Sequence, residues 1–464
     1  MIRLLPYLLI FLVTALPSCK SSDRWKMAAE IEKLILTTSF PADTFNIVEF
    51  GAVADDSSFL NTGAIDAAIK KCNADGGGVV LVPSGTWHTG PVTLLSNVNL
   101  HISENATLLF SADYELYLPP VLTRWEGMDC YNIHPLIYAI DASNIAITGK
   151  GTIDGQASNE VWWWMNGNPE YGWREGMNNQ KISGRMLLLG YEQNQTPVEE
   201  RIFGLEGALR PQLINFNNCN TVLIEDLTLL NSPFWVIHPV RTDNFILRGV
   251  TIISAGPNSD GCDPESCNGV LIENCYFDTG DDCIAIKSGR NNDGRRWSIP
   301  SQNIIVRNCR MADGHGGVVI GSEISGGFSN LFVEDCEMDG PKLLRVIRIK
   351  TSDCRGGVID NVNVRNVKVG KCSEAVLKIN LMYEPGEQCK RGFPPFVRNV
   401  TLENVTSQES QYGIYIIGLD GSVNVSDITL RDCSFNGVQQ GTSITGAERV
   451  NIKKVFINGE KVRL

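Results

Sequence analysis

The stretch NGVLIENCYF, residues 268–277, carries the pattern that decides the fold of this 464-residue chain. It opens on an asparagine, and apolar and polar side chains then alternate, which is the period of a β-strand. The same phrase recurs from residue 220 onward at intervals of 24 to 38 residues, which indicates a repeat architecture. Its other copies are NTVLIED from Asn220, NFILRGV from Asn244, NIIVRN from Asn303, NLFVED from Asn330, NVNVRN from Asn361, NVTLEN from Asn399 and, more loosely, DITLRD from Asp427.

Each repeat also contains a second short apolar run, as in CIAIKS, GVVIGS, RVIRIK and AVLKIN. Turn residues separate the runs, and no amphipathic helical stretch is visible after residue 80. A leucine-rich repeat would show denser leucines and a shorter period. We therefore expect an all-β fold, a parallel β-helix in which each repeat forms one coil. Neighbouring coils would lie about 4.8 Å apart, with the asparagines forming a ladder at one corner.

One helix is expected early in the chain, over residues 61–74. Its apolar residues share one face, which suits a helix that caps the open end of the core. These residues are Ala64, Ile65, Ala68, Ile69 and Cys72. We expect a single catalytic domain over residues 43–464, preceded by a linker and lead-in over residues 20–42.

The N-terminus has the features of an export signal. Arg3 supplies a basic start, and the apolar run from Leu4 to Leu16 has the length of a signal-peptide core. Leu16-Pro17-Ser18-Cys19 resembles a bacterial lipobox, in which the cysteine is lipidated; an ordinary cleavage site is the alternative. The sequence thus predicts a signal peptide over residues 1–19 and an exported protein. It would be periplasmic or anchored to the outer membrane, touching a membrane only through Cys19.

Composition restricts the partners. The formal net charge is −12, so binding of nucleic acid through a global positive field is not expected. An anionic substrate would need local cations. The chain is expected to act as a monomer.

The cysteines do not indicate a dense disulfide framework. Four of the fourteen occupy one local position in successive repeats, which predicts a buried stack of small side chains. These are Cys275, Cys309, Cys336 and Cys433. Cys262 and Cys267 are the expected local disulfide. No spacing typical of a metal site occurs, and neither a metal nor another cofactor is expected.

Three carboxylates, Asp260, Asp281 and Asp282, stand at the edges of strand-like runs. Turn chemistry is the simple explanation. A stacked fold, however, brings them into one row with His315 and with the strand that follows it. Neighbouring like charges repel, so such a row is costly if it serves only structure.

The row suits acid–base chemistry on an acidic substrate. Crowding drives the pKa values of carboxyl groups apart, as hydrolysis of a glycosidic bond requires. Arg348 and Lys350 are two residues apart on a strand, so they point the same way and can hold a substrate carboxylate. The residues together favour cleavage of a polymer of acidic sugars.

Four motifs in this order resemble those of family 28 of the glycoside hydrolases, the polygalacturonases and their relatives. They are Asn258-Ser259-Asp260, with serine where the family has threonine, Asp281-Asp282, Gly314-His315-Gly316 and Arg348-Ile349-Lys350. The resemblance extends to FGAVADD near residue 50 and so covers nearly the whole mature chain. It implies a right-handed parallel β-helix.

The resemblance also implies roles for these residues. Asp281 would be the general acid, Asp260 and Asp282 would activate the water, and His315 would hold the proton of the acid by a hydrogen bond. The family inverts the anomeric carbon. Carboxylates one coil apart, at about 5 Å, would by distance alone suggest retention instead.

The resemblance places Asn258, Arg348, Lys350 and Tyr383 at the substrate. Arg348 and Lys350 would bind the sugar on the leaving-group side. Tyr383 matches a tyrosine that contacts substrate, and a rim aromatic is its alternative. The four tryptophans of residues 161–173 would either stack on sugars or fill a loop.

The implied substrate is galacturonan, and long insertions, mainly residues 156–210, favour exo action by closing one end of a groove. Three alternatives stay open. One is a galacturonidase of the same family that acts on rhamnogalacturonan. The others are a Ca²⁺-dependent pectate lyase and a non-catalytic carbohydrate-binding β-helix.

Overall fold

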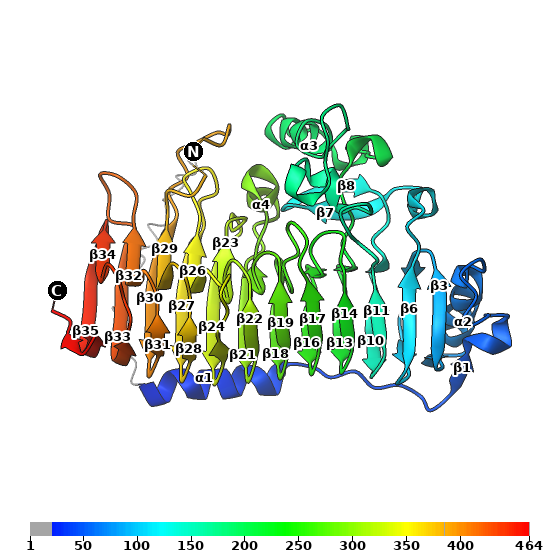
Figure 1. The fold of residues 1–464 in the computed structure, drawn as a ribbon, viewed down its shortest axis with the longest axis horizontal. Coiled ribbons are helices and arrows are strands. Elements are labelled where there is room, and N and C mark those ends of the chain that lie inside the picture. The colour runs from blue at the N-terminus through cyan, green and yellow to red at the C-terminus, as the bar shows by residue number, and fades with distance from the viewer. Residues whose placement is uncertain (1–20, 385, 464) are drawn as a thin grey trace, which may run out of the picture.

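The computed structural model describes residues 21–384 and 386–463. The predicted signal peptide and Cys19 lie outside the described residues. The chain winds through parallel strands that stack into three long ladders, as Figure 1 shows. The predicted parallel β-helix is confirmed.

The first ladder contains the repeated asparagine phrase. β1 (Thr44–Asn46) pairs with its first strand, and the short β36 (Glu460–Lys461) is antiparallel to its last. Its strands are β2 (Gly78–Val82), β5 (Val98–Ile102), β10 (Ser143–Gly149), β13 (Asn220–Glu225), β16 (Asp243–Arg248), β18 (Asn268–Glu273), β21 (Ser301–Arg307), β24 (Phe328–Glu334), β27 (Val358–Arg365), β30 (Phe396–Glu403), β33 (Val425–Phe435) and β35 (Ala447–Ile457).

The second ladder follows the first around each coil. Its strands are β3 (Gly85–Thr89), β6 (Ala106–Phe110), β11 (Thr152–Asp154), β14 (Thr228–Leu230), β17 (Thr251–Ser254), β19 (Tyr276–Thr279), β22 (Arg310–Asp313), β25 (Glu337–Met338), β28 (Lys368–Lys371) and β31 (Thr406–Glu409).

The third ladder contains the second apolar run of each repeat. The ladder has two parts, one ending at β15 and the other beginning at β20, and single bridges through Cys262 join these two strands. Its strands are β4 (Val92–Thr93), β9 (Ile137–Ile140), β12 (Ile214–Asn217), β15 (Ile237–Val240), β20 (Ile284–Ile286), β23 (Val318–Gly321), β26 (Arg345–Lys350), β29 (Ala375–Asn380), β32 (Tyr412–Ile417) and β34 (Thr442–Thr445).

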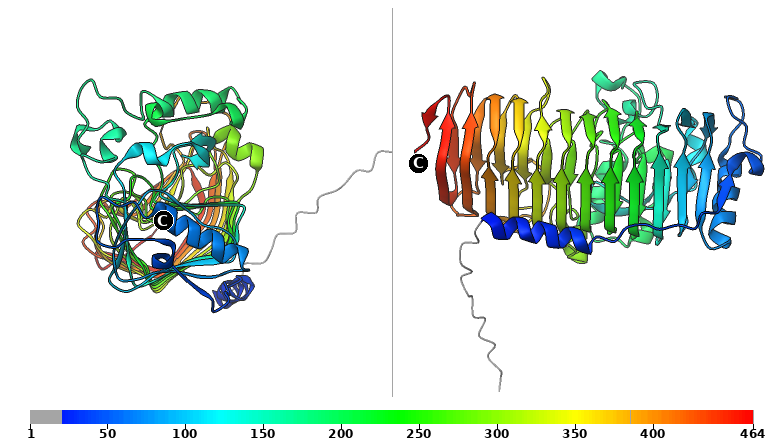
Figure 2. Two further views of the ribbon diagram at one scale, coloured as in Figure 1. Left: turned by 90° about the vertical axis from the view of Figure 1, so that its right-hand side faces the viewer. Right: turned by 90° about the horizontal axis from the view of Figure 1, so that it is seen from below.

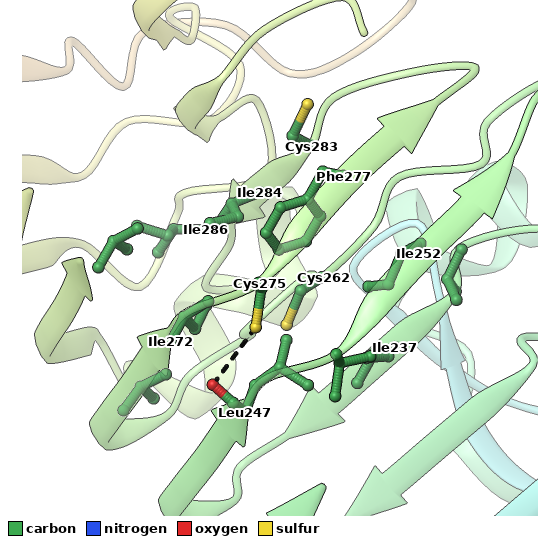
Figure 3. Close-up of a cluster of buried hydrophobic side chains, with 14 of the residues drawn as sticks. Ile237, Leu247, Ile252, Cys262, Ile272, Cys275, Phe277, Cys283, Ile284 and Ile286 are labelled. Atoms are coloured by element: carbon green, nitrogen blue, oxygen red, sulfur yellow. Dashed lines mark hydrogen bonds between the residues drawn. The ribbon is translucent and has the colours of Figure 1, made fainter. Parts of the chain in front are cut away.

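The inward-facing apolar residues of all three ladders form one continuous core. Figure 3 shows a section of it, in which Ile237, Ile252, Ile272 and Ile284 come from four different strands. Stacking of identical positions buries these side chains almost completely, which no single coil could do alone.

The predicted asparagine ladder is present. Asn303 donates to Asn268 over 2.7 Å, Asn330 to Asn303 over 2.8 Å, and Asn361 to Asn330 over 2.8 Å. Asn303, Asn330 and Asn361 adopt φ of 58°, 65° and 60°. Asparagine tolerates this left-handed conformation better than most residues, which explains its recurrence at the corner.

The cysteine predictions have a mixed outcome. Cys275, Cys309, Cys336 and Cys433 are all buried free thiols, as expected. In Figure 3 the Cys275 thiol donates to the Leu247 carbonyl at 3.6 Å.

The predicted bridge between Cys262 and Cys267 is wrong. Both residues are free and buried, because they occupy different strand positions in the core. A disulfide instead joins Cys354 to Cys389, with 5.9 Å between their Cα atoms, and ties together two loops beyond β26 and β29.

The structure contains more helices than the sequence predicted. α2 (Thr62–Ala74) caps the N-terminal end of the core, as expected. α1 (Ser21–Leu34), however, lies in the stretch expected to be a linker, and α3 (Gly184–Gln193) and α4 (Asn291–Trp297) follow residue 80. Within residues 21–384 and 386–463 there are also six 3₁₀ turns: η1 (Ile47–Phe50), η2 (Tyr114–Tyr117), η3 (Trp163–Asn166), η4 (Pro169–Tyr171), η5 (Val198–Glu200) and η6 (Leu205–Gly207).

α1 packs lengthwise on the outer face of the first ladder. Ala28, Ile31 and Ile35 contact a stripe of outward apolar residues, with Trp25 at its edge. The stripe consists of Ile246, Leu271, Ile305 and Phe332, one from each of four consecutive strands. This stripe breaks the alternation expected of a solvated strand, and the helix covers it.

The insertions lie on the opposite side of the solenoid from α1 (Figures 1 and 2). They contain α3, α4 and an antiparallel hairpin of β7 (Val121–Trp125) and β8 (Met128–Asn132). In the described part of the chain, the helices are too short or too polar to cross a membrane.

Candidate active site

A pocket of about 380 Å³ lies on the outer face of the third ladder, below the insertions. The predicted residues Asn258, Asp260, Asp281 and His315 line it. Arg348, Lys350 and Tyr383 complete the predicted part of the lining, and the hairpin, α3 and the loop after β29 contribute Glu126, Arg185 and Glu384.

The three carboxylates converge although they come from separate turns of the chain. Asp260 leads into the strand-like segment at Cys262, and Asp281 and Asp282 occupy the bend between β19 and β20. One oxygen from each lies within 4.8 Å of the others. This spacing is shorter than the roughly 6.5–9.5 Å typical of inverting carboxyl pairs.

Each of the paired acids has its own cation from the next coils. His315 Nδ1 lies 2.9 Å from Asp281 Oδ1. Lys350 Nζ lies 2.7 Å from Asp282 Oδ2, and Arg348 lies 3.5 Å from Asp282 Oδ1. The predicted row is therefore a compact cluster in which the cations neutralise the acids.

The pKa shifts in the cluster have opposite signs. Burial and the charges of Asp263 and Asp281 raise the pKa of Asp260 well above its usual range. Burial also acts on Asp281, but the hydrogen bond and charge of His315 outweigh it and lower its pKa to about 2. The same hydrogen bond raises the pKa of His315. The Asp281–His315 pair thus carries its proton mainly on the imidazole.

The substrate-binding candidates hold different positions. Tyr383 places its ring centroid 5.4 Å from both Arg348 Cζ and Lys350 Nζ, a cation–π arrangement at the pocket edge. Asn258, at φ 55°, accepts a hydrogen bond from the buried Arg210 over 2.8 Å.

Several pocket residues were not predicted as site residues. Lys287 is buried beside Asp260, with 3.8 Å between Lys287 Nζ and Asp260 Oδ2. Arg290 links the walls: it lies 3.1 Å from Glu126 of the hairpin and 2.9 Å from Glu387. It is also 3.4 Å from Glu323, which follows β23. Their charge close to the acid pair was the only signal in the sequence.

The aromatic insertion fills space rather than lining the pocket. Trp162 is fully buried against Tyr114 and Tyr117, and Trp163 donates to the Ser232 carbonyl over 2.9 Å. His238 is also buried, and its Nε2 lies 2.9 Å from Glu265 Oε2.

The hairpin blocks the face of the third ladder on the N-terminal side of the acids. Arg124 reaches down to Glu265 at 3.0 Å, and Thr123 donates to Asn215 over 3.2 Å. Asp129 and Glu265 both face Arg124 inside this contact, so the hairpin is held by buried charges. The pocket is therefore walled at this end.

Comparison with known proteins gives a consistent result. The sequence model of glycosyl hydrolases family 28 matches residues 176–455. A probable polygalacturonase of Vitis vinifera is 32% identical over 337 residues, which cover 70% of this chain but only 60% of the relative. An exo-poly-alpha-D-galacturonosidase of Dickeya chrysanthemi is 26% identical over 92% of this chain and 76% of the relative.

Among solved structures, an exopolygalacturonase from Thermotoga maritima superimposes with a TM-score of 0.91 at 39% identity. The match covers 95% of this chain and 97% of that one. The repeats, the acid cluster and these matches agree: the chain belongs to family 28 of the glycosyl hydrolases and is a glycoside hydrolase.

Proposed function

We propose that the protein hydrolyses α-galacturonosidic bonds of pectic galacturonan, acting from a chain end. The observation that carries this proposal is the acid cluster beside Arg348 and Lys350 in a pocket walled on one side. The relatives named as exo-acting enzymes support the same activity.

Arg348 and Lys350 would select a substrate that carries a carboxylate. Arg348 and Lys350 lie on the C-terminal side of the acids, where the sugar of the leaving group would sit. Its carboxylate would compete with Asp282 for both cations, and charge-assisted contacts of this kind are the strong ones. The chain net charge of −12 would otherwise repel a polyanion, so local cations are required.

The wall explains exo action. The hairpin covers the ladder on the N-terminal side, where the sugar to be released would bind. Arg290 holds together the hairpin, the loop after β23 and Glu387. A galacturonan chain therefore cannot extend past the sugar bound at this end of the pocket. Only a chain end fits, so single sugars are the expected products.

The proposed chemistry assigns Asp281 as general acid and Asp260 with Asp282 as the groups that activate water. Because the pKa of Asp281 is low, this residue must gain a proton when substrate binds if it is to act as the acid. A substrate carboxylate adds negative charge and excludes water, which raises the pKa of a nearby acid and moves the shared proton from His315 to Asp281. Inversion is proposed; ¹H NMR of the first anomer released tests it.

A lyase fits these residues less well. The acid trio already faces Lys350 at 2.7 Å and Lys287 at 3.8 Å, and positive charges at such distances oppose binding of Ca²⁺.

The test is incubation with defined galacturonate oligomers, their methyl esters and rhamnogalacturonan. Galacturonic acid as the first product from galacturonan supports the proposal. Early mixtures of oligomers indicate endo action, and ultraviolet-absorbing unsaturated products indicate a lyase. Release from rhamnogalacturonan alone would transfer the activity to that polymer.

Localisation is a separate proposal that rests on residues 3–19. We infer export, with a lipid on Cys19 and a monomeric enzyme beyond it. The Cys19→Ala variant is expected to leave the membrane fraction, and light scattering of the released protein measures its mass. A wild type that is already free of membranes contradicts the anchor.

A further inference from the structure

Lys287 is a buried cation that the mechanism above does not use. Its side chain is 3% exposed, and its ammonium lies among three carboxylates. Nζ is 3.8 Å from Asp260 Oδ2, 3.3 Å from Asp263 Oδ1 and 3.5 Å from Glu323 Oε2. The ring of Trp235 lies 4.4 Å away and closes the remaining side.

The three acids of the cluster differ in the cations that serve them. Asp282 has Lys350 and Arg348, which the proposed substrate would also use. Asp281 has His315. Among the described residues, Lys287 is the one cation within 4 Å of the Asp260 carboxylate.

The neighbours of Lys287 leave its charge available to Asp260. Asp263 lies closer to Lys287 than Asp260 does, but burial raises the pKa of Asp263 to about 8, so near neutral pH it competes for Lys287 less than an ordinary carboxylate would. Glu323 also pairs with Arg290 at 3.4 Å. The carboxylates together outweigh the burial of Lys287 and raise its pKa, so the ammonium stays charged.

The other charged groups around Lys287 have partners of their own. Glu265 is held by Arg124, and burial lowers the pKa of His238, which leaves that imidazole neutral. The charges of Asp281 and Asp282 are met by the cations described above.

We propose that Lys287 is a positioning residue that keeps the Asp260 carboxylate ionised and oriented as the group that activates water. This inference rests on the proposed hydrolysis. Asp260 needs such a residue because burial and three neighbouring acids, Asp263, Asp281 and Asp282, oppose its charge. Lys287 is suited to the task because its side chain is 3% exposed and is held in place by Asp263, Glu323 and the ring of Trp235.

The test is the acidic limb of the kcat/KM–pH profile, which reports ionisations of the free enzyme. Lys287→Met keeps the side-chain length but removes the charge. We expect this limb to move to higher pH by one unit or more, because an opposite charge at this distance lowers a carboxyl pKa by roughly 1–3 units. Lys287→Arg should keep the limb near its wild-type position.

For a second variant we expect the acidic limb of the kcat/KM–pH profile to shift in the opposite direction. Glu323→Gln removes the other carboxylate that shares Lys287, so more of the positive charge acts on Asp260 and the limb should move to lower pH. The matched control is Lys371→Met, since Lys371 pairs with Glu409 at 2.8 Å on β28, away from the pocket. It should leave the profile unchanged.

The outcomes separate the two proposals. A wild type that releases no galacturonate overturns the proposed function. If the wild type is active, an equal loss at every pH in Lys287→Met assigns the residue to structure alone and overturns the inference. If that variant does not fold, an unshifted limb in Glu323→Gln overturns it instead.

Discussion

Asp281 and His315 form the contact on which the proposed chemistry depends, with 2.9 Å between His315 Nδ1 and Asp281 Oδ1. In the proposed mechanism the pair shares one proton, and Asp281 is the member that would lie next to the glycosidic oxygen. We expect Asp281→Asn to lower kcat on galacturonan by roughly 10²–10⁴-fold, the contribution of general acid catalysis. The loss on 4-nitrophenyl α-galacturonide should be much smaller, because nitrophenolate leaves without a proton.

Asp260→Asn is the matched comparison, since it should lose activity on both substrates. If Asp260→Asn is the variant rescued by the aryl substrate, the two roles are exchanged, as the raised pKa of Asp260 and the lowered pKa of Asp281 would suggest. Circular dichroism checks that both variants keep the fold.

Lys350 has two partners to serve, Asp282 at 2.7 Å and the proposed substrate carboxylate. Lys350→Ala should therefore slow hydrolysis of methyl-esterified chains as well as free ones. The loss on free chains should be about ten- to a hundredfold greater, since a charge-assisted contact contributes about 1.5–3 kcal/mol. Parallel kcat/KM measurements on both substrates give this ratio. Equal losses would assign Lys350 to Asp282 alone.

At the scale of single residues, most of the site residues could be predicted because they belong to four short sequence motifs. Asp260, Asp281, His315 and Lys350 were placed together by stacking alone. Lys287 could not be, because its proximity to Glu323 depends on the register of coils whose loops differ in length.

At the scale of elements, β18 and its copies could be predicted because their alternation repeats. α1 could not, since its partner stripe is visible only when Ile246, Leu271, Ile305 and Phe332 are stacked. The hairpin β7–β8 and α4 belong to insertions, which share no repeat, and α4 has no apolar stripe in NNDGRRW.

Docking of α1 is itself testable. Ile31, 9% exposed, lies in the contact with the ladder. Ile31→Asp loses burial worth about 1.5–3 kcal/mol and introduces an unpaired charge, so α1 should detach. Hydrogen exchange over residues 21–35 should accelerate, while kcat stays unchanged. Lys33→Ala, on the exposed side, is the control. Loss of activity in Ile31→Asp would show that the helix supports the pocket.

For the whole molecule, buried ion pairs set the stability at low pH. Burial alone would raise the pKa values of Glu265 and Glu323. Arg124 beside Glu265, and Lys287 and Arg290 beside Glu323, outweigh this effect, so both pKa values are lowered. A lowered pKa stabilises the folded state above the ordinary carboxyl pKa, and that stability is lost as pH falls. We expect Tm to drop steeply below about pH 4.

The pKa of Asp263 is shifted in the opposite direction, upward. Its pKa of about 8 in the folded state means that the unfolded chain loses a proton first, so stability falls as pH rises from about 4 to 8. Asp263→Asn removes this penalty and should raise Tm at pH 7 but have little effect at pH 3. Asp226→Asn, at an exposed corner, is the control. A destabilised Asp263→Asn at pH 7 would mean that the acid is ionised beside Lys287.

The position of α1 has a practical consequence for the pocket. The helix begins the described chain on one side of the solenoid, and the insertions over the pocket lie on the other (Figure 1). Any attachment made just before α1, whether to a resin, a bead or a tethered fusion partner, would therefore orient the enzyme with its pocket toward the bulk solution. Immobilised protein should then digest polymeric substrate about as readily as protein in free solution.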